Sequence, residues 1–190
     1  AFIAKKDLDT EMTVVRNEYE MGENRPVSVM LKRMQSVLFD WHSYGRNTIG
    51  ARSDIENVEI ENLQAFYHRY YQPDNAVLTV SGKFDVPTVL GWVQDYFGPI
   101  PKPTRTLPHE WTVEPTADGE RFFTIRRPGE QKLVAVGYRI PAALAPDYEP
   151  LAMGVSILGT TPTGRLYKEL VETGMASQVF GWTTPGSHPG

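Results

Sequence analysis

The sequence predicts an α+β fold made of two α/β units joined by a proline-rich segment. Apolar residues recur at three- and four-residue spacing along several stretches, which is typical of amphipathic helices. Short runs rich in β-branched and aromatic residues lie between these stretches and are typical of strands. Five prolines within residues 98–115 forbid a helix there and separate the two units.

The first unit, residues 1–98, is predicted to hold four helices and one strand. The first helix covers residues 7–22, and Gly22 ends it. Its apolar stripe consists of Leu8, Met12, Val15 and Tyr19. Pro26 favours the first turn of the second helix, residues 26–41. The remaining elements are helices over residues 60–71 and 86–97 and a strand over residues 76–81.

The pattern restarts after the proline-rich linker, residues 99–117. The second unit, residues 118–190, is predicted to run strand, strand, helix, helix, strand. Its strands cover residues 121–126, 133–140 and 177–183, and its helices cover residues 147–158 and 165–173.

Composition excludes several classes of protein. Of the 190 residues, 41% are hydrophobic, which is enough to bury a core and excludes disorder over most of the chain. The net charge of −4 argues against a nucleic-acid binder or a protein of anionic membranes. No apolar run approaches the ~20 residues of a membrane span. Because there is no cysteine, disulfides, thiolate zinc sites and a cysteine nucleophile are excluded.

Common catalytic motifs are absent. The chain holds no H-E-x-x-H, H-x-x-E-H, G-x-S-x-G or P-loop pattern. Its four histidines are His42, His68, His109 and His188, and no two are closer than 26 residues in the sequence. For His42, a loop hydrogen bond or a charge at a helix end is favoured over metal ligation. The chain therefore holds no complete zinc motif.

Two glutamates of the first predicted helix stand out. Glu11 and Glu18 are seven residues apart, so they differ by only about 20° around the helix axis. They share or border the apolar face. A carboxylate that faces a core is costly unless it is paired or bound to a metal. These residues are therefore candidates for a metal or acid–base role.

An alternative for these glutamates is purely structural. Both carboxylates would then lie at the edge of the stripe and pair with basic neighbours. Geometry alone favours this alternative. The available partners are Arg16, Arg25 and Lys32.

Several segments resemble the pitrilysin/insulinase zinc peptidases, in the bacterial branch related to the mitochondrial processing peptidase. The resemblance begins with Glu11, Glu18 and the GENRP that follows them at 22–26. Further matches follow in order over most of the chain. They are HSYGR (42–46), TIG (48–50), DIEN (54–57), FY (66–67), YYQPDNA (70–76), GKFD (82–85), YFGPIP (96–101), ILG (157–159) and GRLYKEL (164–170).

The resemblance implies a site and a reaction. In the family, the two histidines of H-x-x-E-H bind Zn²⁺, and a downstream glutamate is the third ligand. Glu18 matches that ligand, and Glu11 matches a second glutamate that supports the site. Three protein ligands leave a position for water, whose pKa falls toward ~7. The family's α/β halves, with helices on a mostly antiparallel sheet, enclose a chamber for peptides. This chain would hold the end of one half and the start of the next.

The resemblance also shows departures. H-x-x-E-H would lie upstream of Ala1, so we expect an excerpt of a longer polypeptide that is inactive on its own. We expect no bound Zn²⁺ in the excerpt. The usual glycine-rich turn of the second half is GTTPTG at 159–164 here, which weakens any substrate role for that loop.

The main prediction is part of a zinc metalloendopeptidase that hydrolyses peptides or small unfolded proteins. The alternative is a non-catalytic homologue that serves as a partner or scaffold subunit. A self-contained binding module is a third interpretation, which the interrupted second unit disfavours. We expect peptide substrates, no nucleic-acid partner, and pairing with a second copy or a related subunit. The resemblance implies the bacterial periplasm, although the cytoplasm stays open.

Overall fold

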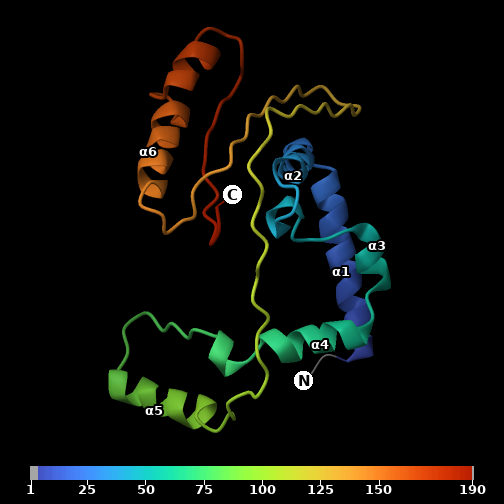
Figure 1. The fold of residues 1–190 in the computed structure, drawn as a ribbon, viewed down its shortest axis with the longest axis vertical. Helices are drawn as coiled ribbons and strands as arrows, with labels where there is room; N and C mark the ends of the chain where they lie inside the picture. Colours follow the sequence, from blue (N-terminus) through green and yellow to red (C-terminus); the bar gives the residue numbers. More distant parts are fainter. Residues whose placement is uncertain (1–3, 190) are drawn as a thin grey trace. The chain divides into compact units, whose positions relative to one another are not determined.

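The computed structural model describes residues 4–189, which form helices joined by long extended connections (Figure 1). The helices are α1 (Lys5–Glu23), α2 (Pro26–Leu38), α3 (Arg52–Asn57), α4 (Ile60–Tyr70), α5 (Val86–Phe97) and α6 (Tyr148–Gly159). Short 3₁₀ turns at Ser43–Gly45 and Pro73–Asn75 and a π-helical turn at Tyr167–Val171 complete the regular structure. Six of these elements confirm the predicted helices to within three residues at either end, and α3 was not predicted.

The chain divides into two units, and both are discontinuous. The first unit combines Ala1–Val29 with Asn47–Val113. The second combines Met30–Arg46 with Glu114–Gly190. The boundary between the units therefore lies within α2. The later turns of α2 belong to the same unit as residues 114–190.

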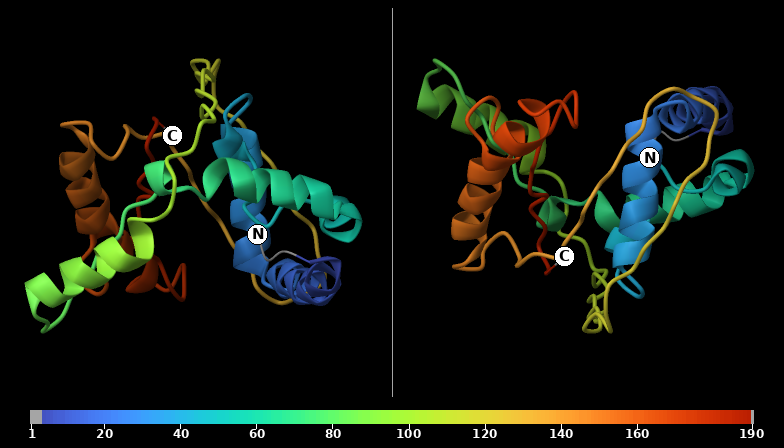
Figure 2. Two further views of the ribbon diagram at one scale, coloured as in Figure 1. Left: turned by 90° about the horizontal axis from the view of Figure 1, so that it is seen from below. Right: turned by 90° about the horizontal axis from the view of Figure 1, so that it is seen from above.

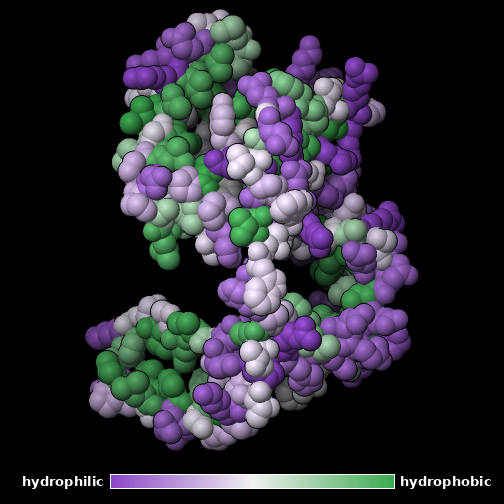
Figure 3. All heavy atoms as spheres, in the orientation of Figure 1, coloured by the Kyte–Doolittle hydropathy of each residue, from purple (hydrophilic) through white to green (hydrophobic). Residues whose placement is uncertain are grey.

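In the first unit, α1 packs against α3. Leu8 of α1 is 5% exposed and Ile55 of α3 is 7% exposed, so each of these helices contributes a buried apolar side chain to the unit. The α5 helix begins with a local cap, because the Asp85 side chain accepts a hydrogen bond of 3.0 Å from the Thr88 amide. Figure 3 shows apolar side chains at the surface over α5.

In the second unit, two close backbone approaches fix how the extended segments meet the helices. A Cβ on Gly137 would lie 2.9 Å from the Met34 sulfur, so the segment around Gly137 passes directly over α2. A Cβ on Gly159 would lie 2.5 Å from the Gly181 amide nitrogen, so the end of α6 touches the segment 177–184. The buried Tyr148 hydroxyl reaches Thr183 Oγ1 at 3.1 Å along the same contact.

The predicted antiparallel sheet is wrong for this structure. The described residues contain no strand, and the predicted strands are extended but unpaired (Figure 2). Their apolar side chains stay in water: Val77 and Val134 are each 93% exposed, and Phe122 is 88% exposed. A strand needs a neighbour ~4.8 Å away to complete its hydrogen bonds, and a run of β-branched and aromatic residues does not by itself supply one. The described residues therefore form helices with extended connections, not the predicted α+β fold.

No helix within the described residues is both long enough and apolar enough to cross a membrane. This agrees with the absence of a long apolar run in the sequence.

We predict that Gly159→Ala destabilises the second unit. The new methyl group would collide with backbone atoms of Gly181, which cannot rotate away, and overpacking of this kind costs about 1–3 kcal/mol. Gly154→Ala is the matched control in the same helix, because nothing lies within 4 Å of its Cβ. Alanine there should be neutral or should stabilise α6 by up to about 1 kcal/mol. Thermal unfolding of both variants tests this, and equal melting temperatures would contradict the close approach.

Candidate functional site

Glu11 and Glu18 both lie on α1, two turns apart. Both side chains are exposed to solvent. Val14, between them in the sequence, is 48% exposed, whereas Val15 is half-buried. The two carboxylates therefore lie in water beside the apolar stripe that meets α3.

Neither carboxylate is paired with another group in the part of the chain that the structure describes. Across residues 4–189, Glu11 and Glu18 have no hydrogen-bond or ion-pair partner. No partner therefore comes from Arg16 or Arg25, which the structural alternative had offered. Their oxygen lone pairs are free to accept a proton or to bind a metal ion.

A polar hollow lies at the carboxyl end of α1. Its lining residues are Tyr19, Glu20, Glu23, Asn24 and Arg52. The Arg52 guanidinium donates a hydrogen bond of 2.7 Å to Glu56, and this bond raises the pKa of Arg52 above its ordinary value. Neither Glu11 nor Glu18 lines the hollow, so it is separate from the predicted metal-ligand positions.

The described chain can supply only part of a catalytic zinc site from α1. Zn²⁺ in such sites takes three protein ligands, usually with histidine among them. The exposed Glu18 carboxylate on a regular helix fits the role of one oxygen ligand. The H-x-x-E-H pattern that would supply the histidines is absent from this sequence.

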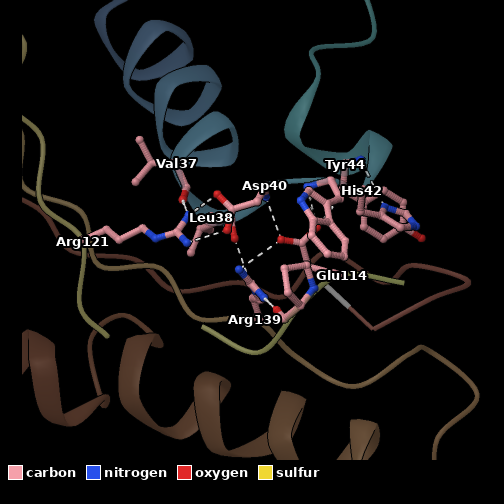
Figure 4. A network of polar contacts seen from close by, with 10 residues as sticks. Val37, Leu38, Asp40, His42, Tyr44, Glu114, Arg121 and Arg139 are labelled. Carbon is pink, nitrogen blue, oxygen red and sulfur yellow. Dashed lines mark hydrogen bonds and ion pairs between the residues drawn. The ribbon is translucent and has the colours of Figure 1, made fainter. Parts of the chain in front are cut away.

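Sequence reasoning missed a dense polar network in the second unit (Figure 4). The Glu114 side chain is 7% exposed and accepts hydrogen bonds from three successive amides. The amide nitrogens of Asp40, Trp41 and His42 lie 2.6, 3.0 and 2.7 Å from its oxygens. The Arg139 guanidinium completes the set with an ion pair of 3.1 Å. No sequence signal marks this glutamate, because the three amides that it accepts from lie 72–74 residues away along the chain.

Two arginines extend the network. Arg121 holds the Asp40 carboxylate with two hydrogen bonds, of 2.7 and 2.5 Å, and also donates to the Val37 carbonyl at 2.8 Å. Arg139 donates to the carbonyls of Leu38 and Pro115. The last carbonyls of α2 are thereby satisfied by side chains from distant segments.

The pKa shifts of the two acidic groups follow from these contacts. Hydrogen bonds from Arg121, which outweigh the opposing desolvation, hold the pKa of Asp40 below its ordinary value. Burial opposes ionisation of Glu114, but the three amide hydrogen bonds and Arg139 outweigh it, so the pKa of Glu114 is also lowered. Both groups are therefore ionised at neutral pH.

His42 makes the loop hydrogen bond that its position favoured. The residue is 6% exposed, and its Nδ1 accepts a hydrogen bond of 3.2 Å from the Tyr44 amide. Because Nδ1 is the acceptor, the proton of the neutral ring is on Nε2. The Tyr44 hydroxyl in turn accepts a hydrogen bond of 3.2 Å from the His188 amide. His42 thus has a structural role in the turn after α2.

Comparison with known proteins identifies the class as peptidases. A family model described as the peptidase M16 inactive domain matches residues 57–190, which is more than half of the chain. The chain belongs to the M16 peptidase family. This confirms the resemblance to the pitrilysin-type zinc peptidases.

The relatives extend the match beyond the family model. Zinc protease PqqE of Helicobacter pylori is 29% identical over 161 residues, which cover 83% of this chain and 36% of that protein. An uncharacterized zinc protease of Mycobacterium bovis is 26% identical over 93% of this chain and 41% of its own length. The crystal structure of a protease from Helicobacter pylori matches with a TM-score of 0.88 at 25% identity, over 98% of this chain and 46% of that chain. The chain thus spans less than half the length of these relatives.

We predict that Glu11→Gln and Glu18→Gln leave the stability of the chain unchanged. Both carboxylates are exposed and unpaired, so the free energy of unfolding should stay within about 0.5 kcal/mol of the original. Leu8→Ala, which empties a buried position of the same helix, should cost about 2–5 kcal/mol. Denaturant unfolding measures all three variants. A clear loss of stability in either glutamine variant would instead indicate a structural role.

Proposed function

We propose that this chain is part of a zinc metalloendopeptidase that hydrolyses peptides or small unfolded proteins. The observation that carries the proposal is the exposed, unpartnered carboxylate of Glu18 on a regular helix in a chain of the M16 family. Relatives named zinc proteases support it. In this proposal Glu18 binds Zn²⁺ together with two histidines of H-x-x-E-H, which other residues of the parent polypeptide supply.

The proposal gives Glu11 a supporting role. Seven residues place the two Cα atoms about 10.5 Å apart along the helix axis. Zinc–carboxylate distances are only about 2.0–2.2 Å, so this separation disfavours both carboxylates on one ion. Glu11 is better placed to orient another ligand by a hydrogen bond, as carboxylates around zinc sites commonly do.

The alternative is a non-catalytic homologue that acts as a partner or scaffold subunit. The matched family model is described as an inactive domain, which favours keeping this alternative. The two proposals differ in what Glu18 does. In a scaffold subunit its exposed charge has no ligand to bind, whereas in an enzyme its removal abolishes metal binding.

We predict that the parent polypeptide, extended upstream of Ala1, binds about one zinc ion per chain and cleaves a quenched fluorescent peptide. Glu18→Gln should abolish both zinc binding and cleavage. Glu11→Gln should lower zinc affinity or activity by about 10–100-fold. Glu20→Gln, an exposed glutamate on the same helix, is the matched control and should keep both properties.

Two outcomes would contradict the proposal. A parent polypeptide without zinc and without cleavage would support the scaffold alternative. Full zinc content in Glu18→Gln would remove Glu18 from the ligand set, even if the enzyme is active.

We further predict that the 190-residue chain is inactive alone and self-associates. It lacks the H-x-x-E-H pattern, so one carboxylate cannot hold Zn²⁺ tightly. Its unpaired extended segments expose Val77, Phe122 and Val134 almost completely. Extended backbone with unpaired amides and carbonyls tends to form hydrogen bonds with another chain. Light scattering at high concentration should show a dimer or larger species. A strictly monomeric mass would contradict the association.

A further inference from the structure

The second unit has to join two stretches that are far apart in sequence. Met30–Arg46 contains most of α2 and the turn after it, whereas Glu114–Gly190 follows more than 60 residues later. The contacts between these two stretches hold the carboxyl-terminal turns of α2 in the second unit. Figure 4 shows the polar contacts that residues 37–42 make with Glu114, Arg121 and Arg139.

Glu114 lies at the centre of these contacts. It is the first residue of the second stretch, and its carboxylate is nearly buried. Oε1 accepts from the Asp40 amide and faces Arg139, and Oε2 accepts from the amides of Trp41 and His42. All three donors belong to one turn, so a single side chain fixes the backbone of that turn.

Arg121 and Arg139 also form hydrogen bonds with residues 37–40. Arg121 grips the Asp40 carboxylate and the Val37 carbonyl, and Arg139 binds the Leu38 carbonyl. We call this set the Glu114 clamp; it comprises Glu114, Arg121, Arg139, Asp40 and the backbone of residues 37–42. Close packing of Gly137 on Met34 lies next to it, so the polar ties and the apolar contact hold the same two stretches.

We propose that the Glu114 clamp is a conformational lock, which makes the end of α2 and the segment 114–139 open and close as one cooperative unit. Because the Glu114 carboxylate satisfies three amides at once, its loss leaves several backbone donors without a partner. The lock does not depend on the proposed peptidase function, since it involves neither Glu11 nor Glu18.

The lock has a defined pH dependence. The charged groups that face the Glu114 carboxylate are Arg139, Arg121 and the Asp40 carboxylate, and the buried His42 ring lies beside the same turn. The lowered pKa of Glu114 means that the ionised form is favoured in the closed lock. Its contribution is therefore complete above the ordinary glutamate pKa of about 4.3 and is lost as the pH falls through the lowered value.

Amide hydrogen exchange on the complete 190-residue chain tests the lock. In the original chain the amides of Asp40, Trp41 and His42 should be protected together. Glu114→Gln replaces one acceptor oxygen by a donor, so their exchange should accelerate roughly ten-fold or more. Glu120→Gln, an exposed glutamate of the same unit, is the control and should change exchange less than about two-fold.

A second measurement separates the two acidic groups and does not need a stable Glu114 variant. An NMR titration of the three amides in the original chain should show one loss of protection at acid pH. Asp40→Asn, which removes the Arg121 ion pair but not the Glu114 hydrogen bonds, should keep that acid step. Unprotected amides in the original chain, or an unchanged exchange rate in Glu114→Gln, would overturn the proposal.

Discussion

The structure of the second unit depends on the hydrogen bonds and the ion pair of one nearly buried carboxylate, that of Glu114. A glutamate that is 7% exposed is stable only if its oxygens are well partnered, and Glu114 is partnered by three successive amides and Arg139. These partners require that the segment beginning at Glu114 runs beside the end of α2. The close packing of Gly137 on Met34 occupies the adjoining position. The arrangement of the second unit therefore follows from where this charge can be accommodated.

The α1 helix presents the opposite situation. Glu11 and Glu18 carry charges that no group within residues 4–189 neutralises, and both remain in water. A carboxylate that contributes little to stability is available for binding at no structural cost. Glu114 therefore differs from Glu11 and Glu18 in its surroundings, because its side chain is nearly buried and partnered, whereas theirs are exposed.

The extended segments show a third constraint. Their β-branched and aromatic side chains favour an extended backbone, yet Val77, Phe122 and Val134 remain almost fully exposed. Exposed apolar surface of this kind is characteristic of surfaces that contact other polypeptide.

The helices and the family could both be predicted from the amino-acid sequence. Periodic apolar residues place α1, α2, α4, α5 and α6, because helical hydrogen bonds join residues only four apart and depend on local sequence. Glu11, Glu18 and the motifs that follow them indicated the peptidase family, because their order and spacing can be compared directly along the sequence. Two features could not be predicted from the sequence: the predicted strands do not pair within the described residues, and the later turns of α2 belong to the same unit as residues 114–190. The amides of Asp40, Trp41 and His42 lie 72–74 positions from Glu114, and contacts between residues so far apart leave no periodic signal in the sequence.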